Sequence, residues 1–250
     1  YIECLGNDFS VIEDVRLSDK DQNAIKSMNT HLHVIEAYAK LYTVLPTQDV
    51  KQSVTQLLDI FEQHIIDPIT FQQKLFFQND WTSTNDLVSY GHDIEAAWLL
   101  LWCAEVIEDK KLIQNYKKYA VEMARVTQEG LDADGGLWYE FDPEKDEMIA
   151  EKHWWPQSEL LIGMVNAYQL TQDKEFLLIA EKNFEFIEKY ILDKVNGEWI
   201  WGINADYSAI EKDKAGFWKC PYHNGRAMME LIKRIDKKAP IPSFPQGGKE

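Results

Sequence analysis

Apolar residues recur at steps of three and four along most of the chain, a spacing typical of amphipathic helices. Residues 21–45 carry the first such stripe and end at Pro46; its members are Ile25, Met28, Leu32 and Ile35. A second stripe covers about 48–66 and stops before Pro68. The same spacing, with helix-ending signals, predicts further helices at about 92–108, 111–129, 154–171, 174–193 and 220–237.

The segments between these helices differ in composition. Residues 70–78 and 196–204 are short and aromatic, and we expect them to be extended. Residues 132–146 read DADGGLWYEFDPEKD, a run of turn-forming residues that predicts a loop or hairpin. Residues 239–250 are rich in proline and glycine, so we expect a flexible tail there.

Every second predicted helix begins near a histidine or tryptophan cluster. The clusters are THLH at 30–33, GHDIE at 91–95, HWWPQSE at 153–159 and PYHNG at 221–225. Successive steps between His33, His92, Trp155 and His223 are 59, 63 and 68 residues, which indicates a repeating helical hairpin. The alternate helices lack such clusters. We therefore predict an all-α fold, an α/α barrel in which inner helices line a pocket and outer helices cover them.

Composition excludes several classes of partner. The chain has 26 Lys and Arg against 42 Asp and Glu, a net charge of −16, which disfavours nucleic acid and anionic membranes. No stretch approaches the ~18 apolar residues of a membrane span. Three scattered cysteines give neither a disulfide framework nor a zinc motif, so we expect a cytoplasmic protein.

Motifs for cofactors and metals are also missing from the sequence. It contains no GxGxxG, P-loop, GxSxG or CxxC pattern, so we expect no cofactor. His31 and His33 stand two apart on a predicted helix, and such residues do not face one another. They make a poor metal pair, and we expect no bound metal.

Two histidines are placed to move protons. His92 and His223 both stand near predicted helix starts, so on one mouth of a ring they could face each other across a pocket. Glu95 follows His92 by three residues, within reach to fix its tautomer and raise its pKa. Capping or burial would explain His92 equally well.

An aromatic ring and a carboxylate share a face of the helix at 154–171. Trp155 and Glu159 are four residues apart, so the ring could stack on a sugar while the carboxylate holds its hydroxyls. Core packing explains many tryptophans, and a purely structural Glu159 is the alternative.

Four blocks of sequence, NTHLHVIEAY, SYGHDIEAAWLL, KHWWPQSELLIG and WKCPYHNGRAMMEL, together resemble the cellobiose 2-epimerases of the N-acylglucosamine 2-epimerase superfamily. The resemblance implies an (α/α)6 barrel that inverts C2 of the reducing-end sugar of a β-1,4-linked disaccharide without a cofactor. The sugar ring opens, a base removes the C2 proton, and a cis-enediolate is reprotonated on its other face.

The resemblance also implies roles for residues. His92 and His223 match the two acid/base histidines, and His33 matches the histidine that binds the reacting oxygens. Glu95 matches the partner of His92. The residues implied to contact sugar are Trp98, Trp155 and Glu159.

Length suggests that only part of this barrel is present. Six hairpins of this size need roughly 400 residues, whereas 250 residues hold four inner and three outer helices, about four of six hairpins. We therefore expect residues 1–250 to be the C-terminal two thirds of a catalytic barrel, with inner-helix surface left exposed, and to be unstable alone or to need the missing part. The family's enediolate-stabilising arginine is expected on an earlier helix, outside this sequence. We expect a monomer or weak homodimer.

Two other functions remain open. Many α/α barrels are glycoside hydrolases that use two carboxylates, and this chain offers Asp132, Asp134, Glu95 and Glu159. A non-catalytic sugar-binding barrel is the other alternative.

Overall fold

The computed structural model describes residues 1–2, 4–16 and 22–236, and the expected tail at 239–250 lies outside them. The described part contains seven α-helices: α1 Met28–Tyr42, α2 Gln48–Ile60, α3 Tyr90–Val106, α4 Lys110–Val126, α5 Trp154–Thr171, α6 Lys174–Phe186 and α7 Tyr222–Asp236. Each of the seven predicted helices is present, which confirms the helical prediction.

The outer helices end in irregular turns. Helix α2 continues as a π-helix over Phe61–Ile65, α6 as a π-helix over Ile187–Ile191, and α4 as a 3-10 turn over Thr127–Gly130. These turns account for the longer segments that the sequence predicts.

The first helix starts later than predicted. It begins at Met28 because Ser27 caps it, its side chain accepting a hydrogen bond from the Thr30 amide at 3.1 Å. Ile25, expected on the apolar stripe, lies before the helix and is 39% exposed.

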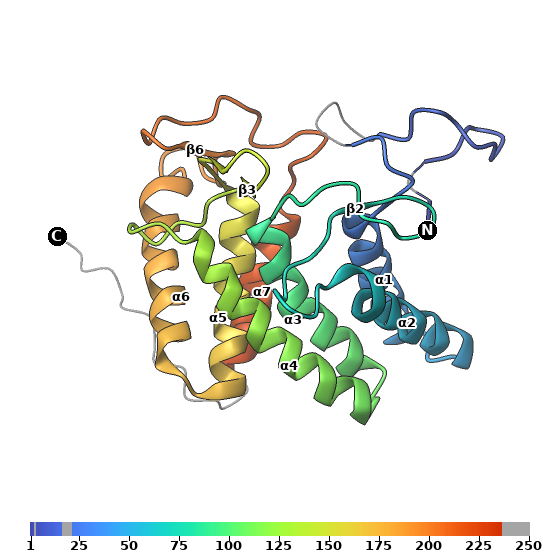
Figure 1. Cartoon of the computed structure of the whole chain (residues 1–250). Helices are drawn as coiled ribbons and strands as arrows, with labels where there is room; N and C mark the ends of the chain where they lie inside the picture. Colours follow the sequence, from blue (N-terminus) through green and yellow to red (C-terminus); the bar gives the residue numbers. More distant parts are fainter. Residues whose placement is uncertain (3, 17–21, 237–250) are drawn as a thin grey trace.

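Short antiparallel strands join the loops in pairs. They are β1 Lys26–Ser27 with β2 Phe76–Phe77, β3 Glu140–Asp142 with β4 Glu147–Ile149, and β5 Glu151–His153 with β6 Gly202–Asn204. The extended segments and the hairpin predicted from sequence lie in these pairs. Figure 1 shows the strands and long loops together at one end of the helices, the top in that view.

The helices form two layers, as predicted. Helices α1, α3, α5 and α7 pack side by side in that order, and α2, α4 and α6 cover them (Figure 1). Every residue of α5 from Trp154 to Tyr168 is buried, because α5 contacts helices of both layers. Helix α4 buries one face, with Leu112, Tyr116 and Ala120 at four-residue steps. The arrangement is an arc of an α/α barrel.

Helix α7 forms one side of this arc and carries exposed apolar side chains. Met229, Ile232 and Ile235 are 59%, 60% and 42% exposed. None of the helices in the described residues is long and apolar enough to cross a membrane.

A loop that closes on itself follows each outer helix, so the predicted repeat is visible in the backbone. Isolated bridges close these loops at Ile66 with Gln73, Leu131 with Leu137, and Leu192 with Trp199. A buried polar side chain from the first turn of the next inner helix then binds each loop. Asp93 accepts from the Gln73 amide at 2.8 Å, Gln157 from the Leu137 amide at 2.8 Å, and Asn224 donates to Glu198 at 2.8 Å. These bonds fix the helix starts at which His92, Trp155 and His223 stand.

Candidate active site

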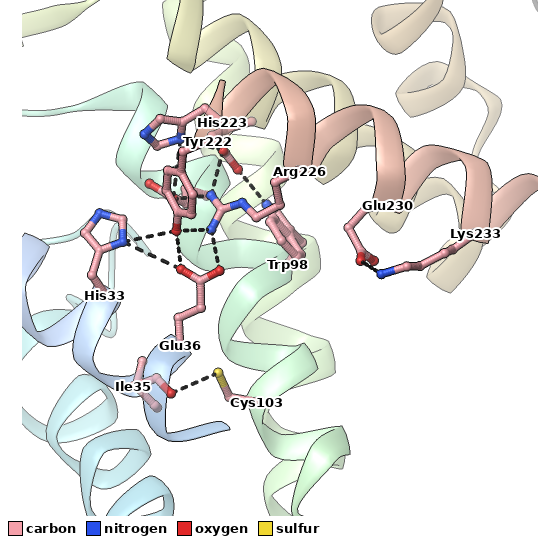
Figure 2. Close-up of polar contacts among 12 residues, drawn as sticks. His33, Ile35, Glu36, Trp98, Cys103, Tyr222, His223, Arg226, Glu230 and Lys233 are labelled. Atoms are coloured by element: carbon pink, nitrogen blue, oxygen red, sulfur yellow. Dashed lines mark hydrogen bonds and ion pairs between the residues drawn. The ribbon is translucent and has the colours of Figure 1, made fainter. Parts of the chain in front are cut away.

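Helices α1 and α7 border an open cavity of about 500 Å³. Its lining residues are His33, Glu36, Ala37, Lys40, Tyr222 and His223. Figure 2 shows His33 and Glu36 projecting from α1 towards Tyr222, His223 and Arg226 on α7. Two of the three predicted catalytic histidines therefore share one cavity.

His223 is oriented by a buried carboxylate. Its Nδ1 lies 2.8 Å from Oε1 of Glu159, whose other oxygen accepts a hydrogen bond from Trp98 Nε1 at 2.9 Å. Because a carboxylate accepts, Nδ1 carries the proton, and Nε2 is the nitrogen that can exchange a proton with a ligand. The imidazole itself is 17% exposed.

A single guanidinium forms ion pairs with three carboxylates at the cavity. Arg226 donates to Glu36 at 2.8 Å, to Glu95 at 2.5 Å and to Glu159 at 2.7 Å, and also to the Tyr222 hydroxyl at 2.6 Å (Figure 2). The paired carboxylates in turn raise the pKa of Arg226 above its ordinary value, against the effect of burial. This cation is therefore committed to the protein's own acids.

These contacts keep the paired acids ionised. Burial would raise the pKa of Glu159, but the charge of Arg226 and the hydrogen bond from His223 outweigh it and lower the pKa to about 2. The pKa of Glu36 is also lowered to about 2, against burial, by its ion pair with His33 and by the charge of Arg226.

His33, rather than His31, faces the cavity. Its Nδ1 lies 3.4 Å from the Tyr222 hydroxyl and 3.7 Å from Glu36 Oε2. Burial would lower the pKa of His33, but the adjacent Glu36 carboxylate and the negative charge of Glu95 raise it above its ordinary value. His31 is fully buried, with Nδ1 donating to the Ser27 carbonyl at 2.7 Å.

His92 is held in the neutral form. Its Nδ1 lies 2.8 Å from the Ser89 hydroxyl, and burial, followed by the charges of His33 and His223, lowers its pKa to about 3. The expected pairing with Glu95 is wrong: Glu95 accepts from Arg226 and lies 3.8 Å from Nδ1 of His223. A buried carboxylate gains more from a permanent cation than from an imidazole that burial keeps neutral.

Trp155 stands between the two acid/base candidates. Its ring centroid is 4.5 Å from that of His92 and 5.5 Å from that of His223. Gly91 allows this approach, because a Cβ there would lie 2.6 Å from the Trp155 ring. The Trp155 ring therefore links His92 to His223 through its contacts with both imidazoles.

The remaining predicted site residues lie under this surface. Glu95 and Glu159 have no exposed area, and Trp98 is only 3% exposed. Their contacts are with Arg226 and with His223, so in this structure they position those two side chains. Direct sugar contact stays a prediction.

Sequence reasoning did not assign Glu36, Tyr222 or Arg226 to the site. Glu36 stands three residues after His33, and Arg226 stands four after Tyr222, so each pair shares a helix face. That spacing was an available signal. The contact between α1 and α7 was not, because 190 residues separate Arg226 from Glu36.

One group of side chains has the composition of a metal site. Within the described part of the chain, ligand atoms of Glu95, Glu159 and His223 lie within 4.8 Å of one another. The Arg226 guanidinium already donates to both carboxylates, so a metal ion would have to displace it. This donor set fits an ion-pair network better than a metal.

Comparison with known proteins gives a consistent result. The N-acylglucosamine 2-epimerase (GlcNAc 2-epimerase) family profile matches residues 10–227. The cellobiose 2-epimerase of Bacteroides fragilis is 42% identical over 233 residues, which cover 93% of this chain and 59% of that protein.

Solved structures of sugar epimerases are also similar to this chain. A sugar epimerase from a ruminal bacterium has a TM-score of 0.89 at 35% identity, covering 94% of this chain and 60% of that one. The cellobiose 2-epimerase from Spirochaeta thermophila has a TM-score of 0.85 at 32% identity, covering 94% and 59%. The chain has the (α/α)6-barrel fold of these epimerases over the part it spans, and it spans about 60% of their length.

Proposed function

This chain belongs to the N-acylglucosamine 2-epimerase family, and from that premise we propose that it acts in a cellobiose 2-epimerase. The proposed reaction converts cellobiose into 4-O-glucosyl-mannose by inverting C2 of the reducing-end sugar. The observation that carries the proposal is that His33 and His223 line one cavity, while the Trp155 ring contacts both His223 and His92.

Inversion at carbon requires proton transfer on both faces of a planar intermediate. The open-chain sugar has an aldehyde at C1, which acidifies the proton at C2. One histidine removes that proton to give a cis-enediolate, the intermediate rotates about C2–C3, and a second histidine returns a proton to the opposite face. Each such transfer typically contributes ~10²–10⁴ in rate.

The protonation states suit a division of labour. The lowered pKa of His92 makes it neutral, as a base must be before it accepts a proton. An enediolate forming beside it would raise that pKa, because an anion favours the imidazolium. His223, with Nδ1 held by Glu159, can present Nε2 to the other face.

Positive charge near the reacting oxygens is the second requirement. His33 supports this role, since its raised pKa favours a protonated imidazole that donates. Arg226 is occupied by three carboxylates and is poorly suited to it. The arginine that the resemblance assigns to an earlier helix would supply the remaining charge.

The carboxylate pairing disfavours hydrolysis. Glu95 and Glu159 both accept from the same Arg226 nitrogen, while Asp132 and Asp134 lie 2.5 and 2.7 Å from the buried Lys152 ammonium. A hydrolase needs one carboxyl group that can protonate the leaving oxygen, whereas all four of these carboxylates are paired with a cation.

The cellular location and the oligomeric state of the protein are also part of the proposal. Cys4, Cys103 and Cys220 are free thiols, which supports a reducing, cytoplasmic location. A monomer or weak homodimer stays a prediction, which light scattering of the purified protein checks.

Incubation with cellobiose in D₂O, followed by NMR, tests the reaction. We expect 4-O-glucosyl-mannose with deuterium at C2, because the transferred proton exchanges with solvent. Free glucose would identify a hydrolase, a keto-sugar would identify an isomerase, and unchanged cellobiose would contradict the proposed substrate.

Substitution tests the residues. We expect His92→Ala and His223→Ala to abolish turnover while circular dichroism stays unchanged, since each removes one proton carrier. His64→Ala is the matched control, because His64 stacks on Trp81 at 4.8 Å outside the site and should leave turnover intact. Normal rates in either site variant would end the assignment.

A further inference from the structure

A second cavity, of about 420 Å³, lies on the loop end of the fold. It is bordered by the loop after α2, the segment leading into α3, and the β3–β4 hairpin. None of its lining residues borders the cavity that holds His33 and His223. Its volume lies within the range of roughly 300–1,000 Å³ that small-molecule sites occupy.

Two amide side chains that line this cavity carry buried polar atoms without a hydrogen-bond partner among the described residues. Gln73 is only 3% exposed, and its Oε1 has no hydrogen-bond partner among the described residues. The Asn85 side chain also has unbonded polar atoms, since its Oδ1 and Nδ2 are both buried without a partner within the described part of the chain. A buried polar atom left unbonded costs free energy, so a polar ligand that opens the cavity wall and bonds these three atoms would gain from it.

The rest of the lining restricts the charge of that ligand. The lining contains three acids, Asp67, Asp86 and Glu129, and one cation, Lys74. The Lys74 ammonium already lies 3.6 Å from the Asp67 carboxylate. An anion is therefore disfavoured. In the described residues these acids do not bring their ligand atoms together as a metal site would.

Apolar side chains complete the wall. Leu87, Val88, Phe141 and Met148 line the cavity beside the amides. A ligand that satisfies both surfaces is neutral, carries several hydroxyl groups, and has an apolar C–H face. A pyranose ring has this chemistry, its C–H face packing on an aromatic ring while its hydroxyls bond carboxylates and amides.

We propose that this cavity is a second carbohydrate site, separate from the catalytic one, which binds a neutral pyranoside of one or two rings. Gln73 places it close to the candidate active site, since its Nε2 donates to the His92 carbonyl at 2.7 Å. The inference goes beyond the epimerase reaction and would hold for a non-catalytic protein as well.

The test uses sugars that cannot react. Methyl β-glucoside and methyl β-cellobioside have blocked anomeric carbons, so their rings cannot open and turnover does not interfere. Protein labelled with ¹³C at methionine methyl groups reports binding at Met148, which Met148→Leu assigns. Met28 and Met164, both buried in the core, serve as internal references.

We expect a saturable shift of the Met148 signal with a dissociation constant of about 1–10 mM. Asn85→Leu should weaken this binding at least tenfold, whereas His223→Ala should leave it unchanged because His223 lies in the other cavity. Circular dichroism checks that each variant is folded. If Asn85→Leu does not fold, Glu129→Gln, a substitution on the exposed rim of the cavity, is used in its place and should also weaken binding. The proposal is overturned if Met148 does not shift at 100 mM sugar. It is also overturned if the folded variant binds as well as wild type, or if His223→Ala removes the shift.

Discussion

Asp93 is a buried acid whose charge should cost the fold stability. It is 1% exposed, and burial raises its pKa to about 7 despite hydrogen bonds from Gln73. Asp93→Asn keeps an oxygen that can accept from the Gln73 amide, a bond of 2.8 Å, and removes the charge. We expect the variant to be more stable than wild type at alkaline pH.

The magnitude follows from proton linkage. The folded pKa of about 7 exceeds the ordinary value of 3.8, so the folded state holds the proton more tightly than the unfolded chain does. The free energy of unfolding therefore falls as Asp93 ionises. The loss grows between about pH 4 and pH 7 and is complete above pH 7. Three units at 1.36 kcal/mol each give an upper limit of about 4 kcal/mol.

Urea unfolding followed by tryptophan fluorescence measures the difference. At pH 8 we expect Asp93→Asn to gain about 2–4 kcal/mol in the free energy of unfolding, and at pH 4.5 to gain no more than about 1 kcal/mol. Asp86→Asn is the matched control, because Asp86 is exposed in the same segment and should change neither value. An equal gain at both pH values, or a loss at pH 8, would refute the reasoning.

Two further predictions concern the ion-pair network. Arg226→Leu leaves the carboxylates of Glu36, Glu95 and Glu159 without their shared cation, so unfolding measurements should show a loss of about 3–5 kcal/mol; wild-type stability would mean that the acids are neutral. Glu159→Gln keeps the size of the side chain but removes the negative charge that pairs with His223. Steady-state kinetics should therefore show kcat lower by ~10²-fold with little change in KM. An unchanged kcat would show that Glu159 does not position His223.

Helix positions were predictable because the signals are local. In α2 the residues Val54, Leu57 and Leu58 are spaced to meet on one face, and all three are buried. The start of α1 was missed because Ser27 is fixed by pairing with Phe76, far along the chain. A cap of this kind depends on tertiary contact as well as on residue type.

Charge pairing shows where sequence reasoning ended. Spacing on one helix allowed Glu95 to meet His92, but the nearest strong cation is Arg226, 131 residues further along the chain. Only the packing of α7 against α5, and of the inner helices around the cavity, brings that guanidinium to the acids.

The sequence by itself determined where the helices lie and which histidines stand near their starts, because periodicity and motif are properties of neighbouring residues. The tertiary structure alone decided their protonation. A pKa depends on burial and on the charges within a few ångströms. Those surroundings lower the pKa of His92 and raise that of His33, although both histidines stand in similar positions along the repeat.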